Sequence, residues 1–336
     1  MPVPLVLVKH AACFAHDTGP GHPEAPVRLS AILEAVHADP GLGPELVAEV
    51  EARPVETQHL LGAHTADHVS FVRRLAERAQ REGRIEWIDP DTAVSGNSFL
   101  AAIAAAGCAV TAAELVATGH ARAAFALARP PGHHAGAQRA AGFCLFNNVL
   151  VAARRLQSLG LARRILVVDW DVHHGDGTQA IAWEDPNTYY LSLHLSPHYP
   201  GTGAARERGG GAGAGTIRNV PLGHGTGRLE YRRRFSEALA SSLQEFEPDF
   251  VLMSAGFDCL AEDPLGGLLL EPEDLHAITE EVMERTRPSA RGRVVAVLEG
   301  GYVPERMGLG AVNVLRALTG LPAVSERLAY PSNERA

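Results

Sequence analysis

The sequence is poor in lysine, and its basic residues are outnumbered. Lys9 is the only lysine, so arginine supplies nearly all of the positive charge. We attribute this bias to GC-rich codon usage, as in many bacteria, and not to chemistry. The chain has 30 lysine and arginine residues and 39 acidic residues, and its net charge of -9 argues against a nucleic-acid-binding surface. A cationic substrate remains compatible with this charge.

Cysteine and long apolar segments are also scarce. No CxxC pair occurs among the four cysteines, which are Cys13, Cys108, Cys144 and Cys259. This pattern favours reduced thiols in a cytoplasmic protein. Cys259 follows a candidate metal ligand, and it is either a small buried filler or a group that supports that ligand. The apolar segment at residues 2–8 is too short for a signal peptide, and we expect no membrane span because no apolar run approaches about 20 residues.

Short aliphatic runs alternate with helical patterns along the chain. Strands are expected at residues 4–8, 123–128, 164–169, 189–194, 249–258 and 294–298, and helices at 65–82, 97–118 and 227–246. No repeat or linker interrupts the alternation, which predicts one doubly wound α/β domain. We expect this domain to cover residues 1–322 and a loosely ordered tail to cover residues 323–336.

The segment 164–177 combines a buried strand with five ionisable side chains within the eight residues 169–176. Asp171 and His173 are two residues apart, so their side chains point the same way from an extended chain. Together they can supply two ligands to a divalent metal ion. Asp169 shares their parity and can orient a neighbour. The alternative, in which these groups only cap the next helix, requires far fewer ionisable residues.

Three other predicted strands also end in reactive side chains. His133 and His134 follow the strand at 123–128, Asp258 ends the strand at 249–258, and Tyr302 follows the strand at 294–298. Ligands of open α/β sheets bind outside the carboxyl ends of the strands.

The ligands expected at this edge of the sheet are Asp171, His173 and Asp258. Three protein ligands leave the open coordination of a catalytic zinc ion, although Fe²⁺ or Co²⁺ also suits oxygen-rich ligands. One of the two histidines can act as general base and acid. Tyr302 can donate a hydrogen bond to a developing oxyanion, unless it is a surface residue of a turn. These groups favour metal-assisted amide hydrolysis.

Further residues flank the expected site. Arg28 lies in the first turn of a predicted helix, where the helix dipole disfavours a cation, so an internal anionic partner is expected. Asp89 and Asp91 lie in a turn and either hold the backbone of a docked peptide or cap a helix. Phe143 lies in a turn where it can wall a narrow channel.

The segments RPPGHHA, GFCLFNN, DWDVHHGDG, SLH, SAGFD and EGGY resemble, in this order and spacing, the zinc-dependent histone deacetylase family. The resemblance includes bacterial class II-like, acetylpolyamine-hydrolysing and acetoin-utilisation-type members. It implies the arginase-deacetylase fold, a single α/β domain with a central eight-stranded parallel sheet flanked by helices. It also implies a hydrolase of linear amide bonds that removes acyl groups from the side-chain amine of acyl-lysine.

The resemblance also assigns roles to individual residues. One zinc ion is assigned to Asp171, His173 and Asp258. His134 becomes the general base and acid, backed by Asp176, and His133 an electrostatic helper, backed by Asp169. Tyr302 becomes the residue that polarises the carbonyl. One or two potassium ions are implied, the second near residues 182–188; the donors of the first are Asp169, Asp171, His173, Ser192 and Leu193.

The substrate tunnel implied by the family is formed by Gly142, Phe143, Tyr199, Leu265 and Asp91. Tyr199 stands where the family usually has phenylalanine. Leu265 stands where one eukaryotic polyamine deacetylase has a glutamate, which favours acyl-lysine as the substrate. The internal cavity that receives acetate is matched by Arg28, Gly300 and Gly301.

Several alternatives stay open. The same site can deacetylate acetylpolyamines or other small amides. A non-catalytic acyl-lysine reader is a second class, and an arginase-like ureohydrolase, which requires two metal ions, is a third. We expect an acylated lysine or an acetylated polyamine as partner, and neither nucleic acid nor membrane. The oligomeric state is open, a homo-oligomer included.

Overall fold

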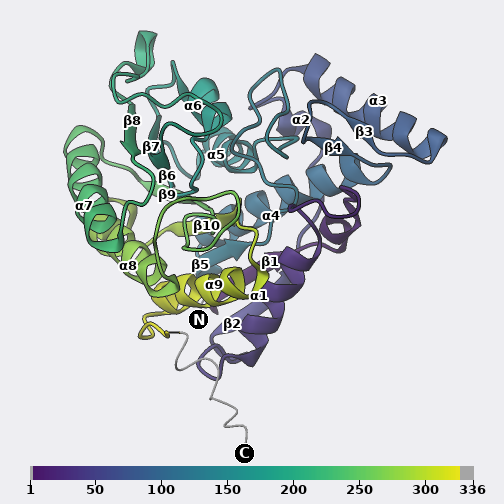
Figure 1. Ribbon diagram of the computed structural model, residues 1–336. Coiled ribbons are helices and arrows are strands. Elements are labelled where there is room, and N and C mark those ends of the chain that lie inside the picture. Colours follow the sequence, from purple (N-terminus) through teal and green to yellow (C-terminus); the bar gives the residue numbers. More distant parts are fainter. Residues whose placement is uncertain (1–2, 326–336) are drawn as a thin grey trace, which may run out of the picture.

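A computed structural model describes residues 3–325. Eight parallel strands form its central sheet in the order β2-β1-β5-β10-β9-β6-β7-β8 (Figure 1). Their bounds are β1 (Val3–Lys9), β2 (Val47–Glu51), β5 (Ala121–Ala126), β6 (Ile165–Asp169), β7 (Thr188–Leu195), β8 (Ile217–Leu222), β9 (Phe250–Ala255) and β10 (Val294–Leu298). A short hairpin pairs β3 (Glu86–Trp87) with β4 (Ala93–Val94). The predicted α/β class with an eight-stranded parallel sheet is confirmed.

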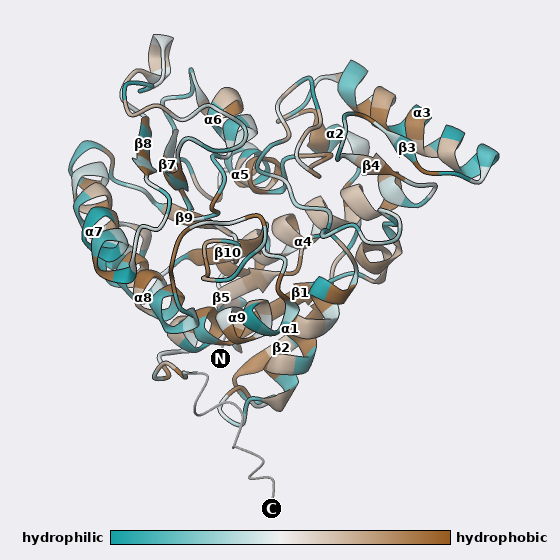
Figure 2. Cartoon of the chain, in the orientation of Figure 1, coloured by the Kyte–Doolittle hydropathy of each residue, from teal (hydrophilic) through white to brown (hydrophobic). Residues whose placement is uncertain are grey.

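Helices cover both faces of the sheet, which explains why its central strands are mostly apolar (Figure 2). One layer contains α4 (Ser98–Ala117) and α5 (Asn148–Ser158), with α3 (Ala66–Glu82) outside α4. The other layer contains α1 (Val27–Ala38), α9 (Pro304–Thr319), α8 (Pro272–Ala290) and α7 (Arg228–Glu245), packed in that order. Shorter elements are α2 (Thr57–Leu60), α6 (Asp176–Ala182) and the 3-10 turns η1 (Ala11–Ala15) and η2 (Gly211–Gly213).

Helix α4 corrects one expectation. It is long and apolar enough to cross a membrane by length and composition, so the expectation that no segment reaches this limit is wrong. In the fold, 67% of its most apolar 18-residue window is buried. The helix packs on α5, β5 and β1, as a core helix does.

The C-terminal end of the described chain packs on α9. Val324 exchanges two hydrogen bonds with the side chain of Asn313 in α9, from its backbone nitrogen at 3.0 Å and to its carbonyl at 2.9 Å. Packed chain therefore continues past residue 322. The rest of the predicted tail, residues 326–336, lies outside the described residues.

The register of the central strands determines what meets at their carboxyl ends. Asp169 at the end of β6 lies opposite Ser254 of β9, and β9 continues beside β10 and β10 beside β5. The segments that follow these four strands therefore emerge side by side. They carry the predicted reactive residues.

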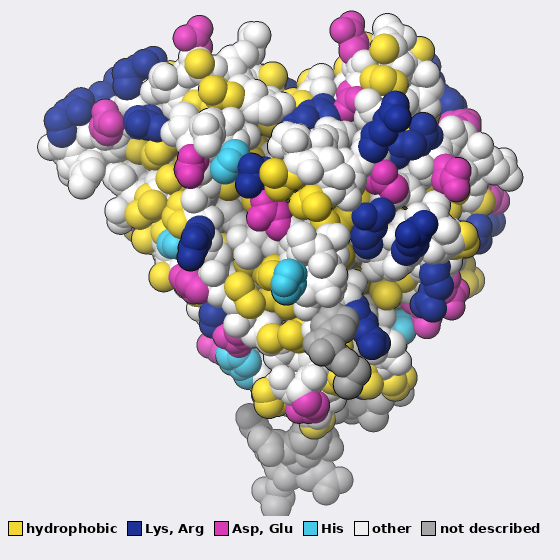
Figure 3. All heavy atoms as spheres, turned by 180° about the vertical axis from the view of Figure 1, so that it is seen from behind, with side chains coloured by type: hydrophobic (Ala, Val, Ile, Leu, Met, Phe, Trp, Pro, Cys, Tyr) yellow, Lys and Arg dark blue, Asp and Glu magenta, His cyan; other side chains and the backbone are white. Residues whose placement is uncertain are grey.

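The molecular surface carries charges of both signs. On the face opposite to that of Figure 1, arginine and acidic side chains lie among one another (Figure 3).

Candidate active site

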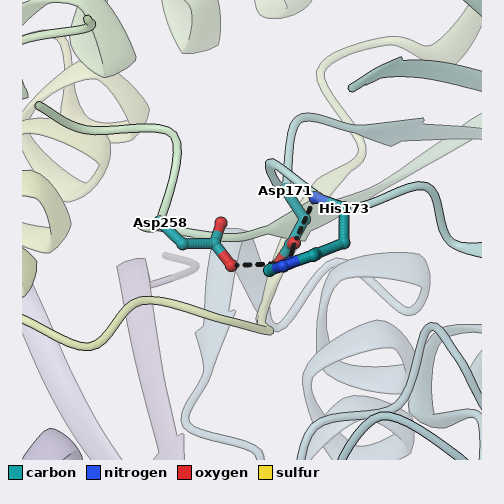
Figure 4. Close-up of side chains that lie close together, drawn as sticks. All are labelled: Asp171, His173 and Asp258. Carbon is teal, nitrogen blue, oxygen red and sulfur yellow. Dashed lines mark hydrogen bonds and ion pairs between the residues drawn. The ribbon is translucent and has the colours of Figure 1, made fainter. Parts of the chain in front are cut away.

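Asp171, His173 and Asp258 meet as predicted. One ligand atom from each lies within 4.8 Å of the others, and all three residues are buried (Figure 4). His173 Nδ1 is 3.1 Å from Asp171 Oδ1 and 3.2 Å from Asp258 Oδ2. Asp171 and His173 come from the loop after β6, and Asp258 comes from the loop after β9. Two neighbouring segments of the sheet edge thus supply one set of ligands.

The backbone holds the two carboxylates of this triad from behind. The Val172 amide donates to Asp258 Oδ1 at 2.9 Å, and the Gly300 amide donates to Asp171 Oδ2 at 2.8 Å. A Cβ atom at Gly300 would overlap both carboxylates, so only glycine fits there. Burial and the nearby Asp171 raise the pKa of Asp258 to about 7. Two crowded, buried carboxylates beside an imidazole suit a divalent cation, and an Asp-His-Asp set suits zinc with open coordination.

His133 and His134 are both buried beside the triad. His134 Nδ1 is 2.8 Å from Asp176 Oδ1, and His133 Nδ1 is 3.1 Å from Asp169 Oδ2. Burial and the neighbouring His133 lower the pKa of His134 to about 3, although Asp176 opposes this. His134 is therefore neutral near pH 7 and able to accept a proton.

Asp169 orients its neighbours, as its parity predicted. Besides His133, its Oδ2 accepts a hydrogen bond from the Tyr190 hydroxyl at 2.9 Å, and its Oδ1 accepts one from the Asp171 amide at 3.1 Å. Ser192, expected as a potassium donor, lies opposite Asp169 in the sheet, and its hydroxyl is 2.9 Å from His194 Nδ1. The expected cation donors are thus adjacent, and the cation itself stays a prediction.

Tyr302 packs inside the site, so the alternative of a surface tyrosine is wrong. Its ring lies 5.1 Å from the Arg28 guanidinium carbon and 5.8 Å from the Phe143 ring. Its amide donates to Asp263 Oδ2 at 2.7 Å, which fixes the backbone. Burial raises the pKa of Tyr302 well above its usual value of 10, so the phenol keeps its proton and can donate it in a hydrogen bond.

Arg28 has the internal anionic partner that its position predicted. Its Nη1 is 2.9 Å from Glu24 Oε1, which also accepts from Arg129 Nε at 2.7 Å. Its Nε donates to the Gly301 carbonyl at 2.7 Å, and its Nη2 donates to the Glu299 carbonyl. All three side-chain nitrogens of Arg28 thus form hydrogen bonds to protein atoms. The role of Arg28 and Gly301 at an acetate cavity stays a prediction.

A cavity of about 270 Å³ leads to the triad. All five predicted tunnel residues line it, together with nine neighbours that include the reactive side chains: Asp91, Gly142, Phe143, Tyr199, Leu265, Pro131, His133, His134, His173, His198, Pro264, Gly266, Gly300 and Tyr302. No lysine or arginine is among these described lining residues.

The wall of the cavity contains a turn at Gly142 and Phe143, in which the backbone of Phe143 is strained. Both have positive φ, 53° and 68°, and this region is costly for a bulky side chain such as Phe143. The Phe143 amide donates to Thr92 Oγ1 at 3.2 Å, which helps to hold the turn. Strain of this kind is typical of functional sites, where the surrounding structure enforces the geometry.

The helix-cap alternative for the turn at Asp89 and Asp91 is wrong. Asp89 Oδ1 accepts from the amides of Asp91 and Thr92 at 3.1 and 2.6 Å, within the turn between β3 and β4. The next helix, α4, starts after Asn97. Asp91 is exposed at the rim of the cavity, where the alternative of holding a docked peptide stays a prediction.

Sequence reasoning overlooked two supporting residues. Glu299 accepts hydrogen bonds from the amides of Gly132 at 2.7 Å and His133 at 3.1 Å, and so anchors the loop that carries His133 and His134, here called the histidine loop. His198 stacks on His173 with ring centroids 5.0 Å apart. A carboxylate at the end of β10 was a usable signal for Glu299, whereas nothing local distinguished His198. All four cysteines are buried and form no disulfide, and the Cys259 thiol donates to the Gly256 carbonyl at 3.6 Å.

The sequence of the chain matches a known protein family over most of its length. Residues 22–318 match the family model of the histone deacetylase domain. The chain belongs to the histone deacetylase family. A relative from Oryza sativa subsp. japonica, "Histone deacetylase 10, chloroplastic", is 34% identical over 93% of this chain and 72% of its own length. A "Probable deacetylase" from Archaeoglobus fulgidus is 36% identical over 89% of this chain and 81% of its own length.

A solved structure extends the likeness to histone deacetylases in three dimensions. The crystal structure of the HDA15 HD domain superposes with a TM-score of 0.87, at 36% identity, over 94% of this chain and 91% of that one. Other plant histone deacetylases are longer, and the chain spans 53% and 44% of histone deacetylases 15 and 5 of Arabidopsis thaliana. Membership of the histone deacetylase family supports a deacetylase function for the chain.

Proposed function

We propose that the chain is a zinc-dependent deacetylase that hydrolyses the side-chain amide of acyl-lysine in peptides or proteins. The observation that carries the proposal is the buried Asp171, His173 and Asp258 triad at the end of a cavity that also presents His134 and Tyr302. Zinc bound there would lower the pKa of water and polarise the substrate carbonyl. We also propose potassium near Asp169 and Ser192, and a cytoplasmic location, which the unpaired thiols support.

The protein side chains would divide the acid-base work. An ionised carboxylate can only accept hydrogen bonds, so the contact with Asp176 requires a proton on His134 Nδ1. The other ring nitrogen, Nε2, is then free to take a proton from water. His134 would then return this proton to the leaving lysine amine. The protonated Tyr302 hydroxyl would donate to the oxygen that becomes negative, a contribution worth roughly 3 kcal/mol in comparable sites.

A small acetylated polyamine is the second candidate substrate. The exposed carboxylate of Asp91 at the rim, and the lack of lysine and arginine among the described lining residues, suit a substrate that carries an ammonium group. Leu265 at the rim is apolar and supplies no further carboxylate to bind that group. For this reason we place acyl-lysine first.

The test compares turnover of an acetyl-lysine peptide and of N-acetylputrescine by zinc-loaded protein, with Asp258→Ala as the blank. We expect faster turnover of the peptide. Tyr302→Phe should keep one zinc per chain and lose about a hundredfold in kcat. Full activity of Tyr302→Phe would refute the role of the hydroxyl. Binding of the peptide without any turnover would instead identify a non-catalytic acyl-lysine reader. Two tightly bound metal ions per chain would favour an arginase-like ureohydrolase.

A further inference from the structure

Arg139 contacts the carboxylate behind the proposed general base from the solvent side. Its Nη2 pairs with Asp176 Oδ2, while His134 Nδ1 lies 2.8 Å from the other oxygen, Oδ1. The Asp176 side chain is 8% exposed and that of Arg139 is 57% exposed. The carboxylate is therefore held between a buried imidazole and a guanidinium at the surface.

The backbone that carries Arg139 is fixed. The Gly136 amide donates to the Arg139 carbonyl at 3.0 Å, which closes a tight turn. Around this turn, the Thr65 amide donates to the Ala137 carbonyl at 2.8 Å and His64 Nδ1 is 2.9 Å from the Gly136 carbonyl. The turn follows His134 directly in the sequence, so one short, anchored segment supplies both partners of the Asp176 carboxylate.

Solvent reaches the Asp176 carboxylate from a second hollow, which is separate from the cavity that leads to the triad. Arg139, Asp176, Gln179 and Thr202 are among the residues that line this open hollow of about 570 Å³. Without Arg139, the Oδ2 atom of Asp176 would face water, and the carboxylate could rotate away from His134 Nδ1. With Arg139 in place, both oxygens are engaged and rotation breaks a charge-assisted hydrogen bond.

We propose that Arg139 is a positioning residue for the deacetylation reaction, acting through Asp176 to hold His134 with its Nδ1 protonated and its Nε2 facing the substrate. The inference rests on the proposed function, since His134 is the base of that reaction. Arg139 is not among the residues that line the cavity leading to the triad, so it should not contact the substrate. Its replacement should therefore change kcat and leave KM nearly unchanged.

The kinetic test uses Arg139→Ala and Arg139→Lys, with Arg206→Ala as the control at another exposed arginine. Arg139→Ala should lower kcat about three- to tenfold, with KM and zinc content unchanged, as expected of an ion pair partly in solvent. Arg139→Lys, or guanidinium added at non-denaturing concentration, should restore much of the loss. In an Asp176→Ala background, Arg139→Ala should have no further effect, because both changes break one chain of contacts. Additive losses in the double variant, or an unchanged kcat in Arg139→Ala, would overturn the inference.

A second measurement does not depend on turnover. In protein with ¹⁵N-labelled histidine, the Nδ1 proton of His134 should give a protected signal that both Asp176→Ala and Arg139→Ala weaken. Loss of this signal in Asp176→Ala alone would refute the role of Arg139. Absence of turnover by the wild-type protein, with the signal responding to both variants, would refute the proposed function and leave the positioning role intact.

Discussion

Replacing Glu24 with glutamine should destabilise the fold measurably, because Glu24 neutralises two buried arginines. Its side chain is fully buried, and its Oε1 contacts both Arg28 and Arg129. Although burial opposes ionisation, Arg129 and Arg28 lower the pKa of Glu24 from 4.5 to about 2. A difference of about 2.5 pKa units corresponds to about 3 kcal/mol of stability. Breaking a buried ion pair usually costs about 3–5 kcal/mol, which agrees.

The pH dependence of this loss of stability follows from the direction in which the pKa of Glu24 is shifted. The folded-state pKa is depressed, so the carboxylate stabilises the fold above the unfolded pKa of 4.5, and this contribution is lost as the pH falls toward about 2. The difference in unfolding free energy between wild type and Glu24→Gln should shrink by roughly 40% between pH 7 and pH 3.5. At pH 7 the Tm should fall by about 4 °C for a chain of this size.

Glu230→Gln is a matched control for this experiment. Glu230 also pairs with two arginines, Arg233 and Arg234, but on the exposed surface of α7. Screening by solvent makes such pairs weak, so the Tm of this variant should stay close to that of the wild type. Urea unfolding and calorimetry of both variants decide the matter. Equal stability losses in the two variants would refute the argument that burial makes the Glu24 pair valuable.

Three further outcomes are expected at the site itself. Gly300→Ala should weaken zinc affinity at least tenfold in calorimetric titration, because its Cβ overlaps both carboxylates; wild-type affinity would show that the loop can yield. Gly142→Ala should lower kcat about tenfold, since its φ is 53° and its Cβ would lie 2.5 Å from His134 Cδ2; an unchanged kcat would contradict the fixed wall. Removal of metal by a chelator should abolish turnover and lower the Tm, and zinc should restore both in the wild type but not in Asp258→Ala; turnover in metal-free protein would exclude the mechanism.

The central strands and the candidate metal ligands could be predicted from the sequence because each depends on a short local pattern. An apolar run such as that of β6 predicts a buried parallel strand, and the two-residue spacing of Asp171 and His173 predicts their common direction. Edge strand β2, in contrast, alternates in burial, and β8 contains Pro221, so neither has the continuous apolar pattern that marks the centre.

Contacts between distant segments were harder to predict. The bonds of Glu299 to the histidine loop and the stacking of His198 on His173 join segments that lie far apart or have no distinguishing pattern, and only the assembled fold brings them together. The same holds for Arg139 and Asp176, which are 37 residues apart. The role of Asp91 was ambiguous because turn residues and helix caps use the same side chains, and the next helix begins several residues later.

The order of the central strands has a consequence for how the protein matures. β5, β10, β9 and β6 are neighbours in the sheet, yet β10 is the last strand within residues 3–325 and β5 lies in the first half of the chain. A nascent chain therefore has its histidine loop and all three candidate ligands before the strand between β5 and β9 has been synthesised. Pairing between strands that are far apart in the sequence is slow, because the conformational entropy of the long loop is lost before the favourable contacts form. The metal site would become complete only when β10 is inserted, so metal uptake would report the final step of folding.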